Sequence, residues 1–171
     1  MDKKIKVLIV EDNFDNVLTA LIAMEELDVE PIIASNVEKA LEILQFRSKE
    51  FLCVLSDMHM PLSSEGGYSK EAGKIVIKEC INRHIPSLVI TKGVHHHEKT
   101  CIEILMPDPM FALAKETVEE FSLVKVKEIE CPEKKVKVWK EAFQTLKEIL
   151  GDDLTENLKT RRLYQKYVER S

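Results

Sequence analysis

The sequence lacks an apolar run that could cross a membrane, since none of its runs approaches the ~18 residues that such a helix needs. Its start, MDKKIKVLIVED, passes from two lysines directly into an apolar run, without the small-residue cleavage site of a secretory signal. We therefore expect a cytoplasmic protein with no membrane partner.

A basic cluster is also lacking. The chain has 25 basic and 30 acidic residues, and its net charge is -5. Proteins that bind nucleic acid or an anionic membrane surface carry a basic patch. The composition therefore argues against nucleic acid as a partner.

The cysteines form no paired motif. Cys53, Cys80, Cys101 and Cys131 lie far apart, and no CxxC is present. This spacing favours reduced thiols in a core over a disulfide framework or a zinc site. Internal repeats and low-complexity linkers are absent as well, so 171 residues with 44% hydrophobic content indicate one globular domain and a short appendage.

Short continuous apolar runs alternate along the chain with segments of helical spacing, which is typical of an α/β fold. The predicted strands are Ile5–Val10, Pro31–Ala34, Phe51–Ser56, Ser87–Thr91 and Leu123–Ile129. Each is followed by a predicted helix, the first with Asn13 as N-cap and Phe14, Val17, Leu18 and Leu21 as its apolar face. Right-handed crossovers then favour a doubly wound, five-stranded parallel sheet of the flavodoxin-like type, with helices on both faces.

The pattern is less regular after Thr91. We interpret residues 92–107 as an embellished loop and expect a helix from Asp108 and another from Pro132. The domain then spans residues 1–150, and residues 151–171 form a C-terminal helical extension. Aromatic and basic residues along this extension suggest docking on a target or a second subunit, so a homodimer is possible.

Polar side chains follow the ends of three predicted strands: Glu11 and Asp12, then Asp57, then Thr91. The carboxyl ends of parallel strands meet at one edge of the sheet, where ligands bind in such folds. Three carboxylates at that edge repel one another unless a cation lies among them. Hard oxygen ligands suit Mg²⁺. Asp57 as a mere turn residue, and Asp12 as a helix-start charge, remain alternatives.

These segments, VLIVEDN with Glu11 and Asp12, LSDMHMP with Asp57 and LVITKG with Thr91, resemble the receiver domains of two-component response regulators. The resemblance covers roughly residues 4–150 and is strongest over residues 4–91. It implies that Asp57 is a phosphoacceptor, that Thr91 is a switch hydroxyl, and that Glu11, Asp12, Asp57 and the backbone carbonyl of His59 hold Mg²⁺.

The resemblance further implies a phosphoprotein in two-component signalling, or in a phosphorelay. The phosphoryl group would come from a histidine kinase or a phosphotransfer protein, and a downstream protein target would read the modified form. We expect phosphoacceptor chemistry rather than turnover of a substrate by an enzyme. A single-domain response regulator is thus the main interpretation.

One departure from the family opens an alternative. The family has a lysine before a proline at the end of its fifth strand, whereas Cys131 precedes Pro132 here. Lys92, Lys125 or Lys127 would have to contact the phosphate instead, with Lys92 the nearest to Thr91 in sequence. The alternative is a degenerate receiver that acts as a phosphorylation-independent interaction module.

A second alternative comes from the segment VHHHEKTC, with His95, His96 and His97. His97 and Cys101 are four residues apart, which would place two ligands on one helical face. A metal-binding or hydrolytic protein that uses this loop is therefore a further hypothesis, weighed against a solvated polar loop.

Overall fold

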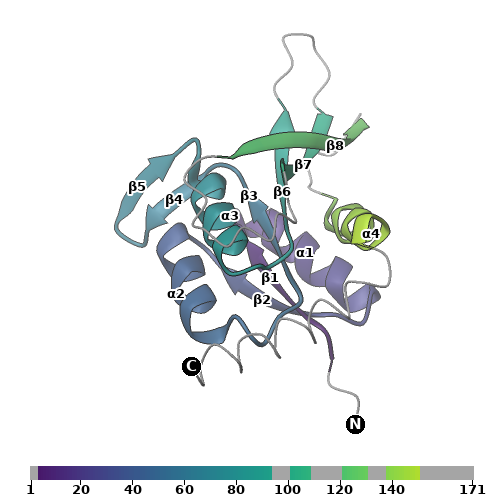
Figure 1. The fold of residues 1–171 in the computed structure, drawn as a ribbon, viewed down its shortest axis with the longest axis horizontal. Helices are drawn as coiled ribbons and strands as arrows, with labels where there is room; N and C mark the ends of the chain where they lie inside the picture. The colour runs from purple at the N-terminus through teal and green to yellow at the C-terminus, as the bar shows by residue number, and fades with distance from the viewer. Residues whose placement is uncertain (1–3, 94–100, 109–120, 131–137, 151–171) are drawn as a thin grey trace.

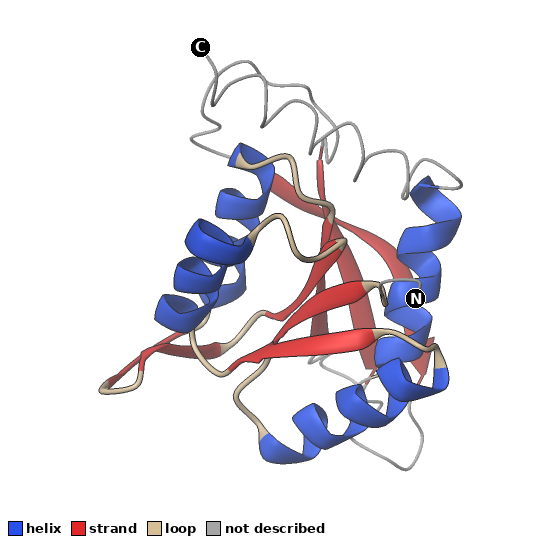
Figure 2. Ribbon diagram, turned by 90° about the horizontal axis from the view of Figure 1, so that it is seen from below, coloured by secondary structure: helices blue, strands red, loops and turns tan. Residues whose placement is uncertain are grey.

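A six-stranded sheet lies between two layers of helices in this protein (Figures 1 and 2). The structure is a computed structural model that describes residues 4–93, 101–108, 121–130 and 138–150. The strand order in the sheet is β2-β1-β3-β6-β7-β8. None of the described helices is long and apolar enough to pass through a bilayer.

The first four strands of this order are parallel. They are β2 (Glu30–Ala34), β1 (Lys6–Val10), β3 (Cys53–Asp57) and β6 (Ser87–Gly93). This order matches the first four positions of the flavodoxin-like sheet, so the predicted doubly wound α/β class is confirmed.

Two apolar layers hold the helices against the sheet. One face of the sheet packs on α1 (Phe14–Glu26) and α4 (Trp139–Leu150), with Met24 and Trp139 among the buried side chains. The other face packs on α2 (Val37–Arg47) and α3 (Ala72–Asn82), with Leu44 and Val76 buried. The central strands β1 and β3 contribute to both layers, which explains their continuous apolar runs.

Helix α1 begins where the sequence predicts, because the side chain of Asn13 accepts a hydrogen bond from the backbone N–H of Asn16. Its predicted apolar face is wrong. Phe14, Leu18 and Leu21 are exposed, and the buried positions of the helix are Asn16, Ala20 and Met24. The predicted apolar residues thus have the helical period, but they lie on the face of the helix that points away from the sheet.

The sheet departs from the prediction after β6. Strand β7 (Cys101–Asp108) runs antiparallel to β6, and β8 (Ser122–Glu130) runs antiparallel to β7. The predicted fifth parallel strand is therefore wrong: Leu123–Ile129 is a strand, but it is antiparallel and lies at the edge of the sheet, beyond β7. The predicted embellished loop is also wrong, because residues 92–93 continue β6 and residues 101–107 belong to β7.

Chain length explains this reversal. Only residues 94–100 separate β6 from β7, and a parallel connection needs a crossover of roughly a dozen residues or more. The strand character of β7 lies in the alternation of Ile102 and Ile104, both buried, with Glu103. Cys101 opens this strand, whereas His97, its proposed partner at helical spacing, lies outside the described residues.

After Asp57 the chain forms a small antiparallel hairpin. Its strands are β4 (Met60–Ser63) and β5 (Gly66–Ser69), which form a separate two-stranded sheet. Gly66 and Gly67 have φ angles of 114° and 80°, which residues with a side chain rarely adopt. The hairpin projects from the main sheet beside α2 and α3 (Figure 1).

The last predicted helix is observed over the described residues as α4, in which Trp139, Phe143 and Leu146 are buried. Several predictions fall outside the described residues. These are the histidine segment, the helix after Asp108, the Cys131–Pro132 pair and the C-terminal extension.

Candidate functional site

A cleft of about 270 Å³ lies at the carboxyl ends of β1, β3 and β6. The residues that line it are Glu11, Asp12, Asn13, Asn16, Asp57, His59, Tyr68, Thr91 and Lys92. All six site residues named from the sequence are among them. The sheet therefore brings together residues that lie up to 81 positions apart, between Glu11 and Lys92 (92 − 11 = 81).

Three carboxylates form the centre of the cleft. One oxygen each from Glu11, Asp12 and Asp57 lies within 4.8 Å of the others. Glu11 is fully buried and Asp57 is 8% exposed, whereas Asp12 is exposed to solvent. Burial of negative charge is costly unless a counter-charge is present, so this arrangement favours a cation among the three groups.

The backbone after β3 orients Asp57. The N–H of Met58 donates to Oδ1 of Asp57 at 2.7 Å, and the N–H of Gly73 donates to the carbonyl of Met58 at 2.9 Å. A Cβ atom on Gly73 would lie 2.3 Å from the carbonyl oxygen of Asp57. The first turn of α3 thus packs directly on the backbone of Asp57, and only glycine permits this approach.

The start of α1 orients Glu11. Its Oε1 accepts a hydrogen bond from the N–H of Asn13 at 3.1 Å, and the backbone N–H of Glu11 donates to the carbonyl of Ala34 on β2 at 2.9 Å. The carbonyl of Asn16, one turn later, accepts a bond of 3.0 Å from the indole of Trp139. Helix α4 thereby supports the segment that carries the acid pair.

The donor set fits Mg²⁺. This ion prefers oxygen ligands in octahedral geometry, with opposite ligands about 4.2 Å apart, and it keeps several waters. The three carboxylate oxygens already lie within 4.8 Å of one another, so small side-chain rotations would bring them to an ion. Asp12 faces solvent, which leaves a path for the ion and its waters.

Thr91 and Lys92 lie at the end of β6, on the rim of the same cleft. Thr91 is buried and Lys92 is half-buried. Lys125 and Lys127, the other candidates for a phosphate contact, are exposed on β8, which β7 separates from β6. Lys125 also forms an ion pair with Glu128. Of these three lysines, Lys92 alone lines the cleft.

Tyr68 and Asn16 are cleft residues that the sequence reasoning missed. Tyr68 lies on β5 and is 63% exposed, and partial desolvation, followed by the negative charges of Asp57, Asp12 and Glu11, raises the pKa of its hydroxyl. The two glycines before Tyr68 were a usable signal, because glycine pairs between short runs indicate a hairpin.

No protein-family model matches the sequence, and no curated protein is significantly similar to it. Among solved structures, the chain is similar to a response regulator receiver domain protein from Clostridium thermocellum. The identity is 22%, the alignment covers 51% of this chain and 64% of that chain, and the TM-score is 0.43.

Two further solved structures are similar to a comparable extent. A bacteriophytochrome response regulator shares 24% identity over 53% of this chain and 69% of its own, with a TM-score of 0.43. The third is a receiver domain from Saccharomyces cerevisiae, crystallised with a histidine phosphotransfer signaling protein. It has 18% identity over 56% of this chain and 67% of its own, with a TM-score of 0.41. All three are response regulators or their receiver domains, the family that the sequence motifs resemble.

Proposed function

We propose that this protein is a receiver-type phosphoacceptor that accepts a phosphoryl group on Asp57 and signals through contacts with another protein. The observation that carries the proposal is the position of Asp57. Its carboxylate shares a cleft with two further carboxylates, a hydroxyl and a lysine, all at the carboxyl edge of the parallel strands.

The donor in this proposal is a phosphohistidine of a histidine kinase or a phosphotransfer protein. An oxygen of Asp57 attacks phosphorus, the phosphorus–nitrogen bond of the donor breaks, and its electron pair stays on the imidazole nitrogen, which takes up a proton. The product is an acyl phosphate on Asp57 and a neutral donor histidine. The hydrogen bond from Met58 to Oδ1 holds the carboxylate in a defined orientation for this attack.

Mg²⁺, when bound, neutralises negative charge that develops on the phosphoryl oxygens. Glu11, Asp12 and Asp57 would hold it, with the backbone carbonyl of His59 as a further ligand. Glu11 is fully buried at the cleft, and the hydrogen bond from the N–H of Asn13 orients its carboxylate.

Thr91 and Lys92 serve the product state in this proposal. An aspartyl phosphate brings about -2 charges at neutral pH, and together with the carboxylates of Glu11 and Asp12 this negative charge exceeds the positive charge of one divalent ion. The hydroxyl of Thr91 donates to a phosphate oxygen, and the ammonium of Lys92 supplies the additional positive charge. Both residues lie at the end of β6, so phosphorylation shifts the population of conformations at this strand end and the surface next to it.

Intact mass spectrometry tests the proposal. The full chain is incubated with Mg²⁺ and a small acyl-phosphate donor, and a gain of one phosphoryl group is expected. Asp57→Asn should show no gain. Asp28→Asn is the matched control, because Asp28 is exposed and has φ of 55°, which asparagine tolerates well, and it should gain the phosphoryl group normally.

A degenerate receiver is the second candidate, and the sequence around Cys131 favours it. The family's lysine is missing before Pro132, and β8 does not adjoin β6. If the wild-type chain binds Mg²⁺ but gains no phosphoryl mass from a small donor or a kinase, the phosphoacceptor proposal fails. An interaction module that works without phosphorylation is then the better description.

A further inference from the structure

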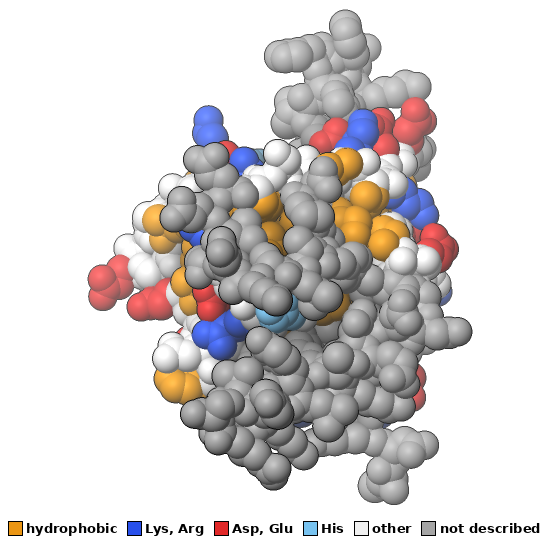
Figure 3. Space-filling model, in the orientation of Figure 1, with side chains coloured by type: hydrophobic (Ala, Val, Ile, Leu, Met, Phe, Trp, Pro, Cys, Tyr) orange, Lys and Arg blue, Asp and Glu red, His pale blue; other side chains and the backbone are white. Residues whose placement is uncertain are grey.

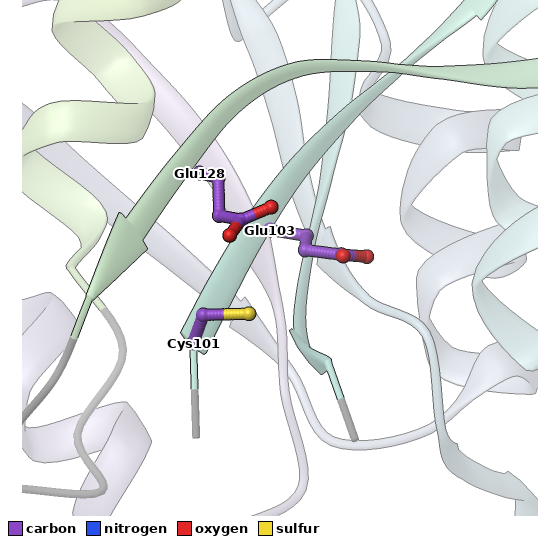
Figure 4. Close-up of side chains that lie close together, drawn as sticks. All are labelled: Cys101, Glu103 and Glu128. Carbon is purple, nitrogen blue, oxygen red and sulfur yellow. The ribbon is translucent and has the colours of Figure 1, made fainter. Parts of the chain in front are cut away.

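A second group of potential metal ligands lies on β7 and β8, outside the cleft (Figure 4). It consists of Cys101 and Glu103 on β7 and Glu128 on β8, and one ligand atom from each lies within 4.8 Å of the other two. Glu103 is paired with Glu128 across the two antiparallel strands. Cys101 precedes Glu103 by two positions and therefore projects from the same face of the sheet.

This grouping is unfavourable as it stands. Like charges directly opposite each other on neighbouring strands destabilise a sheet. The thiol of Cys101 is beside them and is only 3% exposed. Within the described part of the chain, its own backbone amide is the one hydrogen-bonding group found for this thiol. The buried thiol and the two carboxylates thus lie within 4.8 Å of one another.

Lys125 offsets part of this repulsion through an ion pair with Glu128. Acidic and basic side chains also lie next to each other at this end of the molecule in Figure 3. Both partners of the pair are partly exposed, with side-chain accessibilities of 46% and 39%. An ion pair this exposed contributes little to stability because solvent screens it, so a stronger cation can displace Lys125.

We propose that Cys101, Glu103 and Glu128 form a binding site for a divalent transition-metal ion of the zinc type, separate from the carboxylate cluster around Asp57. One sulfur and two carboxylate oxygens are a donor set that zinc accepts, whereas Mg²⁺ prefers oxygen ligands only. Three protein ligands leave the fourth tetrahedral position open to water or a small ligand. On binding, Cys101 loses its proton to solvent and coordinates as a thiolate.

The geometry requires only local adjustment. Sulfur and oxygen ligands of a tetrahedral zinc ion lie about 3.5 Å apart, and the three groups are now within 4.8 Å. Cys101 is held in the sheet, while the longer side chains of Glu103 and Glu128, half-buried and exposed, can rotate toward it. The backbone pairing of β7 with β8 already sets the spacing of the ligands.

The two sites share no residue, but they lie on neighbouring strands of the sheet. Thr91 of the cleft is paired with Glu103 across β6 and β7. The sequence has no paired cysteine motif, and ligands that come from two strands of opposite direction have no fixed spacing along the chain.

Cobalt binding to the full-length chain tests the site, because Co²⁺ bound to a thiolate has a charge-transfer absorption band. We expect this band in the wild type and its displacement by Zn²⁺. Cys101→Ser should abolish the band, and Glu103→Gln and Glu128→Gln should each weaken cobalt binding by about tenfold or more.

Cys53→Ala and Cys80→Ala, at other buried cysteines, should keep the band. Lys125→Met should strengthen binding because it removes the competing cation.

The proposal is overturned if the wild type shows no thiolate band, or if Cys101→Ser retains it. The proposal is also overturned if Cys131→Ser loses the band and Cys101→Ser keeps the band. The glutamine variants, at partly exposed positions, allow the test even if Cys101→Ser fails to fold. Asp57→Asn should keep the band, so failure of the phosphoacceptor proposal is distinguishable from failure of this one.

Discussion

Gly73 determines how closely α3 approaches Asp57. A Cβ at this position would lie 2.3 Å from the carbonyl oxygen of Asp57 and 2.9 Å from Cα of Met58. Both neighbours are backbone atoms, so they cannot rotate away as a flexible side chain could. Residue 73 therefore couples the stability of the fold to the position of the candidate phosphoacceptor.

We expect Gly73→Ala to destabilise the protein by about 1–3 kcal/mol, the typical cost of overpacking, and to weaken Mg²⁺ binding. Urea unfolding and Mg²⁺ titration would measure the two effects. Lys74→Ala is the matched control on the same helical turn, where the side chain is half-buried and forms a surface ion pair with Glu71. It should change stability by no more than about 0.5 kcal/mol. Equal effects of the two substitutions would contradict the close approach.

Tyr68 should report on the charge of the cleft. Partial desolvation, and then the negative charges at Asp57, Asp12 and Glu11, raise the pKa of its hydroxyl. A cation bound by the carboxylates cancels the repulsion of the tyrosinate, so Mg²⁺ should lower this pKa. Alkaline titration of tyrosine absorbance, with and without Mg²⁺, measures the shift, and Tyr68→Phe should remove it. A shift that persists in Tyr68→Phe would assign it to another tyrosine.

Most of the cleft could be predicted because strand ends in a parallel sheet share an edge. Glu11, Asp12, Asp57 and Thr91 each follow or end a readable apolar run, so their meeting place follows from topology. Tyr68 could not be predicted in the same way. It reaches the cleft from a hairpin whose strands are short, partly exposed and outside the main sheet.

At the scale of elements, α1 shows what periodicity can and cannot establish. The spacing of Phe14, Leu18 and Leu21 correctly indicates a helix. The buried face, however, contains the polar Asn16, whose carbonyl is bound by Trp139 from α4. A local pattern contains no information on a partner that lies 123 positions away in the sequence. It therefore cannot predict that the face with Asn16 is the buried one.

The contact between α4 and α1 should depend on the Trp139 indole. Trp139→Phe removes the bond to the Asn16 carbonyl, but the hydroxyl of Thr19 still donates to that oxygen at 2.9 Å. The carbonyl is not left unsatisfied, so we expect a loss of only about 1 kcal/mol. Trp139→Ala should cost about 3–5 kcal/mol because a fully buried aromatic ring is lost. Urea unfolding followed by circular dichroism measures both, and similar losses would contradict a separate role for the hydrogen bond.

At the scale of the whole molecule, the fold could be predicted as far as β6 and not beyond it. Each parallel strand before that point is connected through a helix, and the helix period marks the crossover. After β6 the chain reverses within a short segment, and the apolar residues of β7 alternate over only a few positions. The edge strand β8 is exposed along most of its length, so its residues carry little information on direction.

The antiparallel pairing of the last strands also bears on the order in which the sheet assembles. Val7 of β1 pairs with Cys53 of β3, which requires closure of a long loop, whereas β6 and β7 are joined by residues 94–100 alone. Loop-closure entropy rises with length, so the β6–β7–β8 pairings can form and open locally, while the parallel core is lost only as a unit.

Hydrogen exchange should therefore divide the sheet in two. We expect amides of β8 to exchange through local opening, with a rate that the core substitution Trp139→Phe leaves almost unchanged. Amides of β1 and β3 should exchange only through global unfolding. In that variant, their free energy of exchange should fall by the same amount as the free energy of unfolding. Native-state exchange followed by mass spectrometry or NMR measures this. Equal loss of protection in β8 and β1 would mean that all six strands open together. The expected division would instead allow the edge that carries Glu128 to open while the cleft around Asp57 stays folded.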